Sequence, residues 1–274
     1  MMCALYQVTR AGYYAWQRRQ PSDRALADAH LIEQVRQVHE QSRGYYGSPR
    51  VVGQLRREGI SVGRRRVARL MREAHLQGRS ARLYRRSKVG QRAFFASIPN
   101  QQREMDVRAP NQLWVGDVTY LRVAGQWRYM AAVMDRHSRR IVGWSLSVRR
   151  DAALTSDALR LSIRNRKPAA GLVFHSDRGI EYAAFEYRDQ LARRGIVQSM
   201  NRPGKMNDNA PMESFFHSMK AEQIHGMKFD DDQQLHRALQ SYIAFYNQQR
   251  IHSSLRYLPP AAFEQQQGYQ PCVN

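Results

Sequence analysis

Apolar residues in the first quarter of this 274-residue chain recur with the spacing of helices. Their positions predict helices over residues 24–40, 48–58 and 63–74. Ser48 stands where a helix cap is preferred, and Pro49 follows at the first helical position. The second and third helices are short and are joined by a glycine-containing turn, which is typical of a helix-turn-helix. We therefore expect a small all-α region here.

The pattern changes at about residue 111, where short apolar runs separated by turn residues replace the helical spacing. These runs predict strands over residues 113–121, 128–135, 139–147, 172–175 and 196–200. Helical spacing predicts helices over residues 155–166, 184–194, 210–222 and 232–249. Three strands joined by hairpins, followed by alternating helices and strands, predict an α/β fold with a mixed five-stranded sheet and flanking helices.

These changes of pattern divide the chain into five segments. Residues 1–43 are an N-terminal helical segment, and residues 44–76 are the helix-turn-helix. Residues 77–107 hold few apolar residues among many arginines, which indicates a basic linker. Residues 108–264 form the α/β unit with its C-terminal helices, and residues 265–274 are a polar tail.

The chain carries a formal net charge of +21, and only five of its 44 basic residues are lysines. Arginine binds phosphate through paired hydrogen bonds, so this bias favours a nucleic-acid partner, although a preference for arginine codons explains part of it. The predicted DNA contacts are basic residues of the third helix and of the linker: Arg64, Arg65, Arg66, Arg69, Arg72, Arg85, Arg86 and Lys88.

Other features of the composition suggest where the protein works. No apolar run reaches the roughly 18 residues of a membrane span, and the start lacks a basic-then-apolar secretory signal. Cys3 and Cys272 offer neither a disulfide framework nor the spacing of metal ligands. We expect a cytoplasmic protein that works on DNA and binds no membrane.

Three acidic residues stand in distinctive settings: Asp117 lies within an apolar strand, Asp177 directly follows another strand, and Glu213 opens a helix. A carboxylate in an apolar strand is costly unless it is paired or binds a cation. Oxygen ligands suit Mg²⁺ or Mn²⁺, and two such ions can clamp the attacking and leaving oxygens of a phosphoryl transfer. Spacing alone leaves three other carboxylates as competitors for such a site: Asp135, Glu181 and Asp208.

The motifs around these acids resemble the catalytic subunit (OrfB type) of the insertion-sequence-three family of bacterial transposases, which is related to retroviral integrases. The matching blocks are WVGDVTY at 114–120, HSDRG at 175–179, NAPMESFF at 209–216 and YNQQRIHSSL at 246–255. YYGSPR at 45–50 resembles the family's helix-turn-helix region, so the resemblance covers nearly the whole chain. Glu181 departs from the family, which favours an uncharged polar residue there.

The resemblance implies a ribonuclease-H-like core with a DD(35)E triad, since 35 residues separate Asp177 from Glu213. The triad would be both catalytic and metal-binding, with two Mg²⁺ (or Mn²⁺) ions as cofactors. It also implies DNA contacts by Lys220, which follows Glu213 by seven residues, and by Lys205 in a loop like the mobile loop of integrases. Arg250 in the last block is assigned to phosphate rather than to buttressing the sheet.

The implied function is that of a DNA transposase that cleaves transposon ends and transfers a strand by 3′-hydroxyl attack on a phosphodiester. Its expected partners are transposon-end and target DNA, further copies of itself on DNA, and a protein or fusion encoded by an upstream reading frame. Two alternatives remain: a non-catalytic DNA-binding regulator of transposition, and a ribonuclease-H-like nuclease acting on RNA. Intact acidic motifs argue against the first, and the helix-turn-helix argues against the second.

Overall fold

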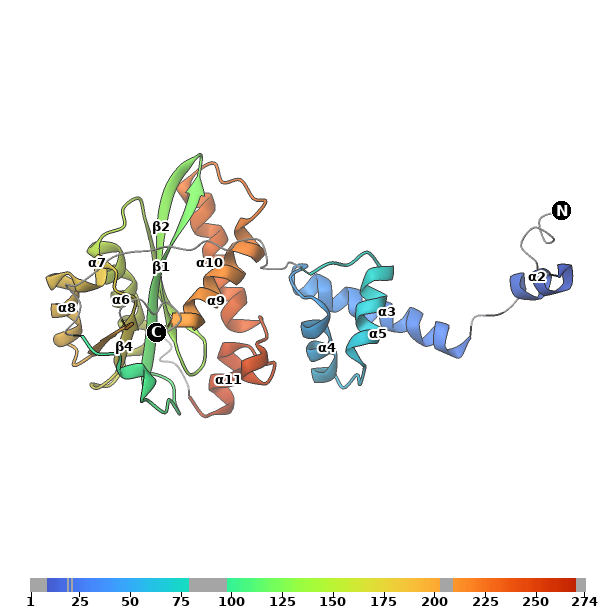
Figure 1. Cartoon of the computed structure of the whole chain (residues 1–274), viewed down its shortest axis with the longest axis horizontal. Helices are drawn as coiled ribbons and strands as arrows, with labels where there is room; N and C mark the ends of the chain where they lie inside the picture. Colours follow the sequence, from blue (N-terminus) through green and yellow to red (C-terminus); the bar gives the residue numbers. More distant parts are fainter. Residues whose placement is uncertain (1–8, 19, 21, 79–97, 203–208, 270–274) are drawn as a thin grey trace. The chain divides into compact units, whose positions relative to one another are not determined.

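The computed structural model describes the chain except for residues 1–8, 19, 21, 79–97, 203–208 and 270–274. The chain divides into two compact units, Met1–Gly78 and Arg79–Asn274 (Figure 1). Among the described helices, none combines the length and the apolar character that crossing a bilayer requires.

The first unit contains the described helices α2 (Arg10–Gln17), α3 (Asp23–Gln41), α4 (Ser48–Arg57) and α5 (Arg64–Glu73). Val35 of α3, Leu55 of α4 and Val67 of α5 are fully buried, and the three helices contact one another. Helix α3 therefore packs on the two helices of the helix-turn-helix. The spacing of apolar residues within each helix does not predict this packing. Gly47, and not Ser48, is the N-cap residue of α4.

Asp28 of α3 links α5 to this packing. Arg66 Nε donates to Asp28 Oδ1 at 2.6 Å, and Arg69 donates to the other carboxylate oxygen. The two guanidinium groups, Arg69 first, hold the pKa of Asp28 below its usual value. Two of the five α5 arginines predicted to bind DNA thus make contacts within the unit. The other three are exposed: Arg64, Arg65 and Arg72.

The second unit is built on a mixed five-stranded sheet, as predicted. Its strands are β1 (Leu113–Val123), β2 (Gln126–Asp135), β3 (Ile141–Ser147), β4 (Val173–Ser176) and β5 (Val197–Met200). They lie in the order β3-β2-β1-β4-β5. The first three strands pair antiparallel, whereas β4 pairs parallel to both β1 and β5. Strand β1 is therefore central, and the carboxyl end of β4 lies beside Gly116 of β1.

Helices flank this sheet on two sides (Figure 1). On one side lie α6 (Ala152–Arg166), α7 (Ile180–Ala183) and α8 (Phe185–Ala192). On the other lie α9 (Ala210–Met219), the π-helix η3 (Lys220–Ile224), α10 (Asp232–Gln248) and α11 (Pro260–Gln266). Two short 3₁₀ turns, η1 (Gln101–Arg103) and η4 (Ser253–Leu255), complete the described elements. The short helices α2, α7 and α11 lack enough turns to give a periodic signal in the sequence.

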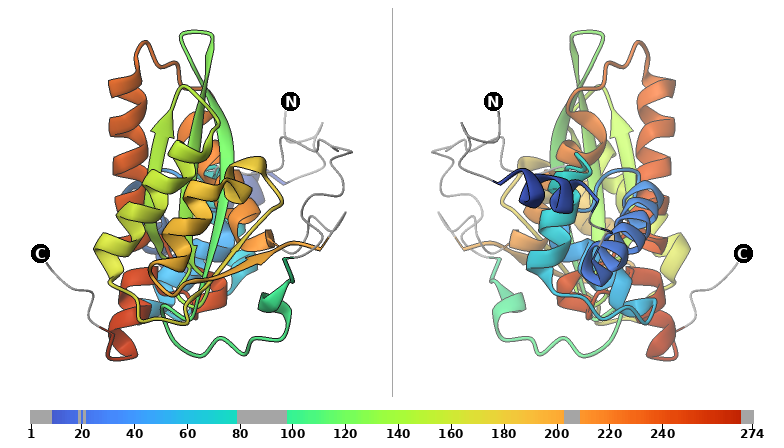
Figure 2. Two further views of the ribbon diagram at one scale, coloured as in Figure 1. Left: turned by 90° about the vertical axis from the view of Figure 1, so that its left-hand side faces the viewer. Right: turned by 90° about the vertical axis from the view of Figure 1, so that its right-hand side faces the viewer.

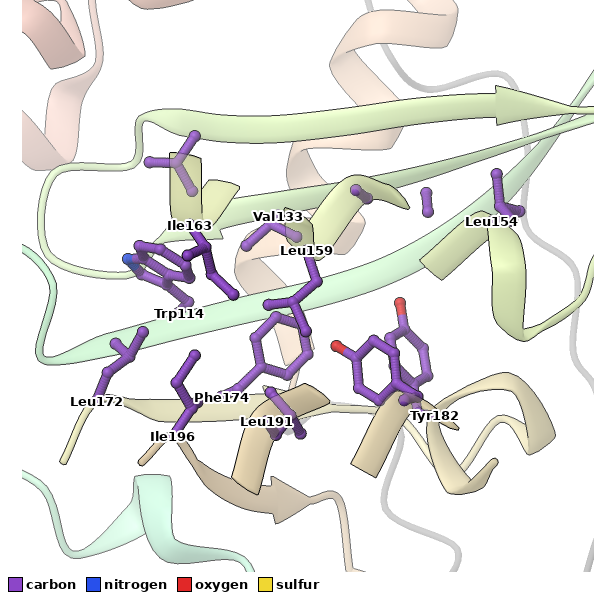
Figure 3. Packing of buried hydrophobic residues seen from close by; sticks show 14 of the residues in the cluster. Trp114, Val133, Leu154, Leu159, Ile163, Leu172, Phe174, Tyr182, Leu191 and Ile196 are labelled. Atoms are coloured by element: carbon purple, nitrogen blue, oxygen red, sulfur yellow. The ribbon is translucent and has the colours of Figure 1, made fainter. Parts of the chain in front are cut away.

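The core on the α6 side joins β1 firmly to β4. Trp114 of β1 and Phe174 of β4 are register partners, and both are buried. Figure 3 shows them packed with Leu159 of α6 and Tyr182 of α7. Burying such large aromatic side chains stabilises the unit strongly. The carboxyl end of β4 and the neighbouring Gly116 of β1 are thus held side by side on a rigid support.

Candidate active site

Two of the three predicted acids meet at this support. Gly116 of β1 pairs with Ser176 of β4, and each is followed directly by an aspartate, Asp117 and Asp177. Side chains at equal register on paired parallel strands point to the same face. Asp117 Oδ1 accepts a hydrogen bond from the backbone N–H of Val118 at 2.7 Å, and Asp177 Oδ1 accepts one from Gly179 at 3.0 Å. Both carboxylates are therefore fixed next to each other.

The charges of these aspartates are mutually unfavourable. Burial, and next the charge of Asp177, raise the pKa of Asp117 to about 8, and Glu213 adds to the rise. Burial and the charge of Glu181 raise the pKa of Asp177. Arg150 opposes both shifts but does not cancel them. Carboxylates in such an environment take up either a proton or a cation.

Glu213 approaches the same end of the sheet from α9. Asn209, the N-cap residue of this helix, is buried, and its Nδ2 donates to the carbonyl oxygen of Gly116 at 2.9 Å. Glu213 lies four residues further on, so it shares the helix face of Asn209. Its side chain is exposed. Within the described ranges, no three His, Cys, Asp or Glu side chains are close enough together to hold an ion. The structure therefore joins the two aspartates and leaves Glu213 near enough for its charge to raise the pKa of Asp117, but not near enough for the three to hold an ion.

An ion pair that the sequence analysis missed borders the aspartates. Glu181 of α7 is buried, and Arg150 donates to its Oε1 from Nε at 2.9 Å and from Nη2 at 2.7 Å. The sequence did mark Glu181 as unusual for the family. A glutamate among apolar residues indicates that a basic partner lies nearby. The sequence does not identify Arg150 as that partner, because the fold brings the two together.

Of the other two competing carboxylates, the described one, Asp135, takes no part in this site. Asp135 is buried, and its oxygens accept hydrogen bonds from the backbone N–H groups of Asn111, His137 and Ser138 at 2.6 to 3.0 Å. It therefore shapes the turn after β2. Asp208 lies outside the described residues, as do four predicted DNA contacts: Lys205, Arg85, Arg86 and Lys88.

Lys220 is the first residue of η3 and lies near Tyr120 of β1. Its Nζ stands 4.4 Å from the centroid of the Tyr120 ring. Burial lowers the pKa of Lys220, while the charge of Asp117 opposes the shift. The lysine is therefore near enough to Asp117 to sense its charge, and π-helical turns of this kind are frequent at functional sites.

The predicted phosphate contact of Arg250 is wrong for this structure. Arg250 is only 2% exposed, and its Nε and Nη2 donate to the two oxygens of Glu222 at 2.8 and 2.7 Å. Tyr242 donates to the same carboxylate at 2.8 Å. A guanidinium group that is buried and paired in this way has no surface to offer a phosphate, so Arg250 buttresses η3 and α10.

His175 has a structural role. Its Nδ1 is hydrogen-bonded to Ser199 Oγ at 2.8 Å and its Nε2 to Asn201 Oδ1 at 2.6 Å. The side chain is fully buried. The network ties β4 to β5 directly before Asp177, which supports the position of that aspartate.

Comparisons with known proteins agree with this architecture. Residues 107–206 and 194–260 match family models described as Integrase core domain, and residues 25–84 match one described as HTH-like domain. The core resembles the HTLV-2 integrase catalytic core domain solved in complex with magnesium. That likeness has a TM-score of 0.45 and 15% identity, and it covers 57% of this chain and 97% of the other.

Relatives with much higher identity extend over almost the whole chain. The IS600 insertion element's uncharacterized 31 kDa protein from Shigella sonnei is 37% identical, over 96% of this chain and 97% of its own length. The transposase InsF for insertion sequence IS3A from Escherichia coli (strain K12) is also 37% identical, over 96% of this chain and 92% of its own length. The chain therefore belongs to the IS3 family of DNA transposases, whose catalytic core is of the integrase type and whose activity is DDE-type polynucleotidyl transfer.

Proposed function

We propose that Asp117, Asp177 and Glu213 form the active site of this transposase and hold two Mg²⁺ or Mn²⁺ ions. The observation that carries the proposal is the pair of aspartates on adjacent parallel strands, where burial and mutual repulsion raise the pKa of Asp117 to about 8. Carboxylate oxygens are the ligands that these hard cations prefer. The donor set therefore fits the ions, and Glu213 on α9 supplies the third carboxylate.

The reaction cleaves a phosphodiester at the transposon end and then joins the freed 3′-hydroxyl to another phosphodiester. When bound, paired divalent ions activate an attacking oxygen and stabilise a leaving one. The protein itself orients the reacting groups. Asn209 holds the start of α9 against β1, which keeps Glu213 within reach of Asp117. Lys220 supplies a positive charge for a DNA phosphate beside this site.

The partners of the active protein are transposon-end DNA, target DNA and further copies of the chain. The chemistry supports more than one copy, because two element ends must be brought together before strand transfer. A protein or fusion encoded by an upstream frame supplies part of the end recognition. The exposed arginines of α5 supply a further, sequence-independent attraction to DNA.

The test is strand transfer of a labelled transposon end with Mn²⁺. Asp117→Asn, Asp177→Asn and Glu213→Gln should each abolish the product while leaving DNA binding intact. Asp157→Asn is the matched control, because Asp157 is an exposed aspartate on α6, paired with Arg160 rather than with the active-site carboxylates. Product formed at the normal rate by any of the three triad variants would refute its assignment.

The same assay separates the two alternatives. A regulator would bind DNA with the same affinity in every variant and give no product under any metal condition. A nuclease of the ribonuclease H type would cut an RNA–DNA hybrid in preference to duplex DNA. Either result would replace the proposed strand-transfer activity.

A further inference from the structure

Beyond the acidic site, the hairpin of β1 and β2 carries an exposed row of aromatic rings and cations. Tyr120 is 42% exposed and Trp127 is 47% exposed, and their rings meet edge to face with centroids 5.1 Å apart. Arg122 lies over the Trp127 ring at 4.8 Å, and Lys220 lies over the Tyr120 ring at 4.4 Å. We call Lys220, Tyr120, Trp127 and Arg122 the hairpin strip.

The hairpin strip begins at the proposed active site. Lys220 makes the connection, because its Nζ lies over the Tyr120 ring and it senses the charge of Asp117, which stands three residues before Tyr120 on the other face of β1. The pairing of β4 with β1 runs only from Leu113 to Gly116. From Asp117 onward, β1 therefore extends past β4 and pairs with β2 alone in the described sheet, so the strip follows a stretch of strand that β4 does not cover. Figure 2 shows the hairpin reaching beyond the rest of the sheet.

The hairpin is braced, so the strip is held in place before anything binds. The backbone N–H of Ala124 at its tip donates to the carbonyl of Phe229 at 3.0 Å. Arg128 Nε donates to Asp232 Oδ1 at 2.7 Å, at the start of α10. The cation–π contacts restrain the long side chains of Arg122 and Lys220. A cation that is already ordered loses less entropy when it binds an anion.

We propose that the hairpin strip binds the sugar-phosphate backbone of the DNA strand that leaves the active site. Arg122 and Lys220 contact phosphates, and the rings of Trp127 and Tyr120 act as positioning residues that hold the two cations. The inference rests on the proposed active site at Asp117, because that site places the DNA beside the strip. It extends the DNA path from Lys220 along the hairpin to Arg122.

The chemistry of the strip favours DNA over an apolar protein partner. The exposed rings carry cations on their faces. An apolar partner would therefore bury two positive charges without compensation, whereas an anionic partner would pair with them. The chain has a net charge of +21 and belongs to a family that acts on DNA. Aromatic and cationic side chains placed together are a common surface for nucleic-acid strands.

The test measures DNA binding by the full chain in EDTA over a range of salt concentrations, which makes it independent of cleavage. The affinity for duplex DNA falls as salt rises, and removing one phosphate contact reduces the steepness of log affinity against log salt by about 0.9. Arg122→Ala should lower the slope by this amount. Trp127→Ala should lower the slope equally, because the ring holds Arg122 in place. The double variant, Arg122→Ala with Trp127→Ala, should bind DNA no more weakly than either single variant. Trp127→Phe, which keeps a ring, should retain most of the slope.

The control is Arg164→Ala, which removes the same charge from an exposed position on α6. Its slope should equal that of the unmodified chain. An unchanged slope in Arg122→Ala, or an equal loss in Arg164→Ala, would overturn the proposal even if Trp127→Ala proved unstable. Trp127 fluorescence, taken as the difference between the wild type and Trp127→Phe, should also change on adding DNA. Because no metal is present, the result stands apart from the strand-transfer test of Asp117.

Discussion

Arg150 and Glu181 form an ion pair beside Asp117 and Asp177, the two aspartates of the proposed active site. The Glu181 side chain is 1% exposed, whereas Arg150 is 44% exposed. The carboxylate has therefore left water and depends on Arg150 for its charge compensation, while the guanidinium remains partly solvated. The charge of Glu181 repels that of Asp177 and raises its pKa, and the positive charge of Arg150 opposes this effect.

Removing Arg150 should therefore destabilise the protein more than neutralising Glu181. Arg150→Ala leaves a buried charge without compensation, and we expect the free energy of unfolding to fall by about 2–3 kcal/mol, less than the roughly 3–5 kcal/mol of a fully buried pair because Arg150 is partly in water. Glu181→Gln keeps a hydrogen-bonding group and should cost about 1 kcal/mol. Urea unfolding measures both, with Arg149→Ala as an exposed neighbouring control. Equal effects of Arg150→Ala and Arg149→Ala would contradict this account.

The raised pKa of Asp117 should make the metal-free protein less stable as pH increases. The pKa rises from 3.8 to about 8 on folding, so the folded state holds an extra proton between these values. The stability from that proton is complete below pH 3.8 and is lost as pH rises through about 8. The slope from one group is at most about 1.4 kcal/mol per pH unit. Urea unfolding in EDTA should show that the free energy of unfolding falls with pH, and the fall should be smaller in Asp117→Asn.

Adding Mn²⁺ should reverse this trend in the wild type. A cation bound only to the folded state stabilises it, and the effect should grow with pH because the metal displaces the proton on Asp117. The thermal midpoint should therefore rise with Mn²⁺ more at high pH than at low pH. The same rise in Asp117→Asn would show that the metal binds elsewhere.

Asn209 should matter for activity beyond its effect on stability. Asn209→Ala removes the hydrogen bond that the side chain donates to the Gly116 carbonyl, at a cost of about 0.5–1.5 kcal/mol. Because α9 then shifts relative to β1, strand transfer should slow by roughly tenfold to a hundredfold. Asn165→Ala is the matched control, since Asn165 donates to the carbonyl of Val142 at 3.0 Å away from the site. A similar loss of activity in both variants would assign Asn209 a structural role only.

Arg250 should affect folding and not the number of DNA contacts. Breaking the buried pair with Glu222 should lower the free energy of unfolding by about 3–5 kcal/mol in Arg250→Ala. At a temperature where this variant is folded, the salt dependence of its DNA binding should be unchanged. Arg65→Ala, which alters an exposed α5 arginine, should leave stability alone and lower the salt slope by about 0.9. A reduced slope in folded Arg250→Ala would restore its predicted phosphate contact.

Local patterns in the sequence were sufficient for the sheet and for the positions of the acids. The five strands appear because apolar runs bounded by turn residues are local signals, and Asp117 and Asp177 are marked by the strands that carry them. Their adjacency is less local, since it needs the parallel pairing of β1 with β4. The motif resemblance supplied that step, and the register of Gly116 with Ser176 accounts for it physically.

The residues that were assigned incorrectly or overlooked depend on partners far away in the chain. Arg250 was read as a surface cation because its partner Glu222 lies 28 residues earlier. Arg150 was overlooked because its partner Glu181 lies 31 residues later. The pattern of charges along the sequence cannot distinguish a paired, buried arginine from a solvated one. In a chain so rich in arginine, a buried arginine is therefore easily predicted to be a DNA contact.

Gly116 makes the geometry of the aspartate pair sensitive to a single methyl group. A Cβ atom at this position would stand 2.5 Å from the ring of Phe174, which is itself enclosed by the core (Figure 3). Even alanine would have to push the central strand away from its parallel neighbour. The separation of the two carboxylates is therefore set by the absence of a side chain, and a mutational scan should find this position as intolerant as the acids themselves, although it touches neither metal nor DNA.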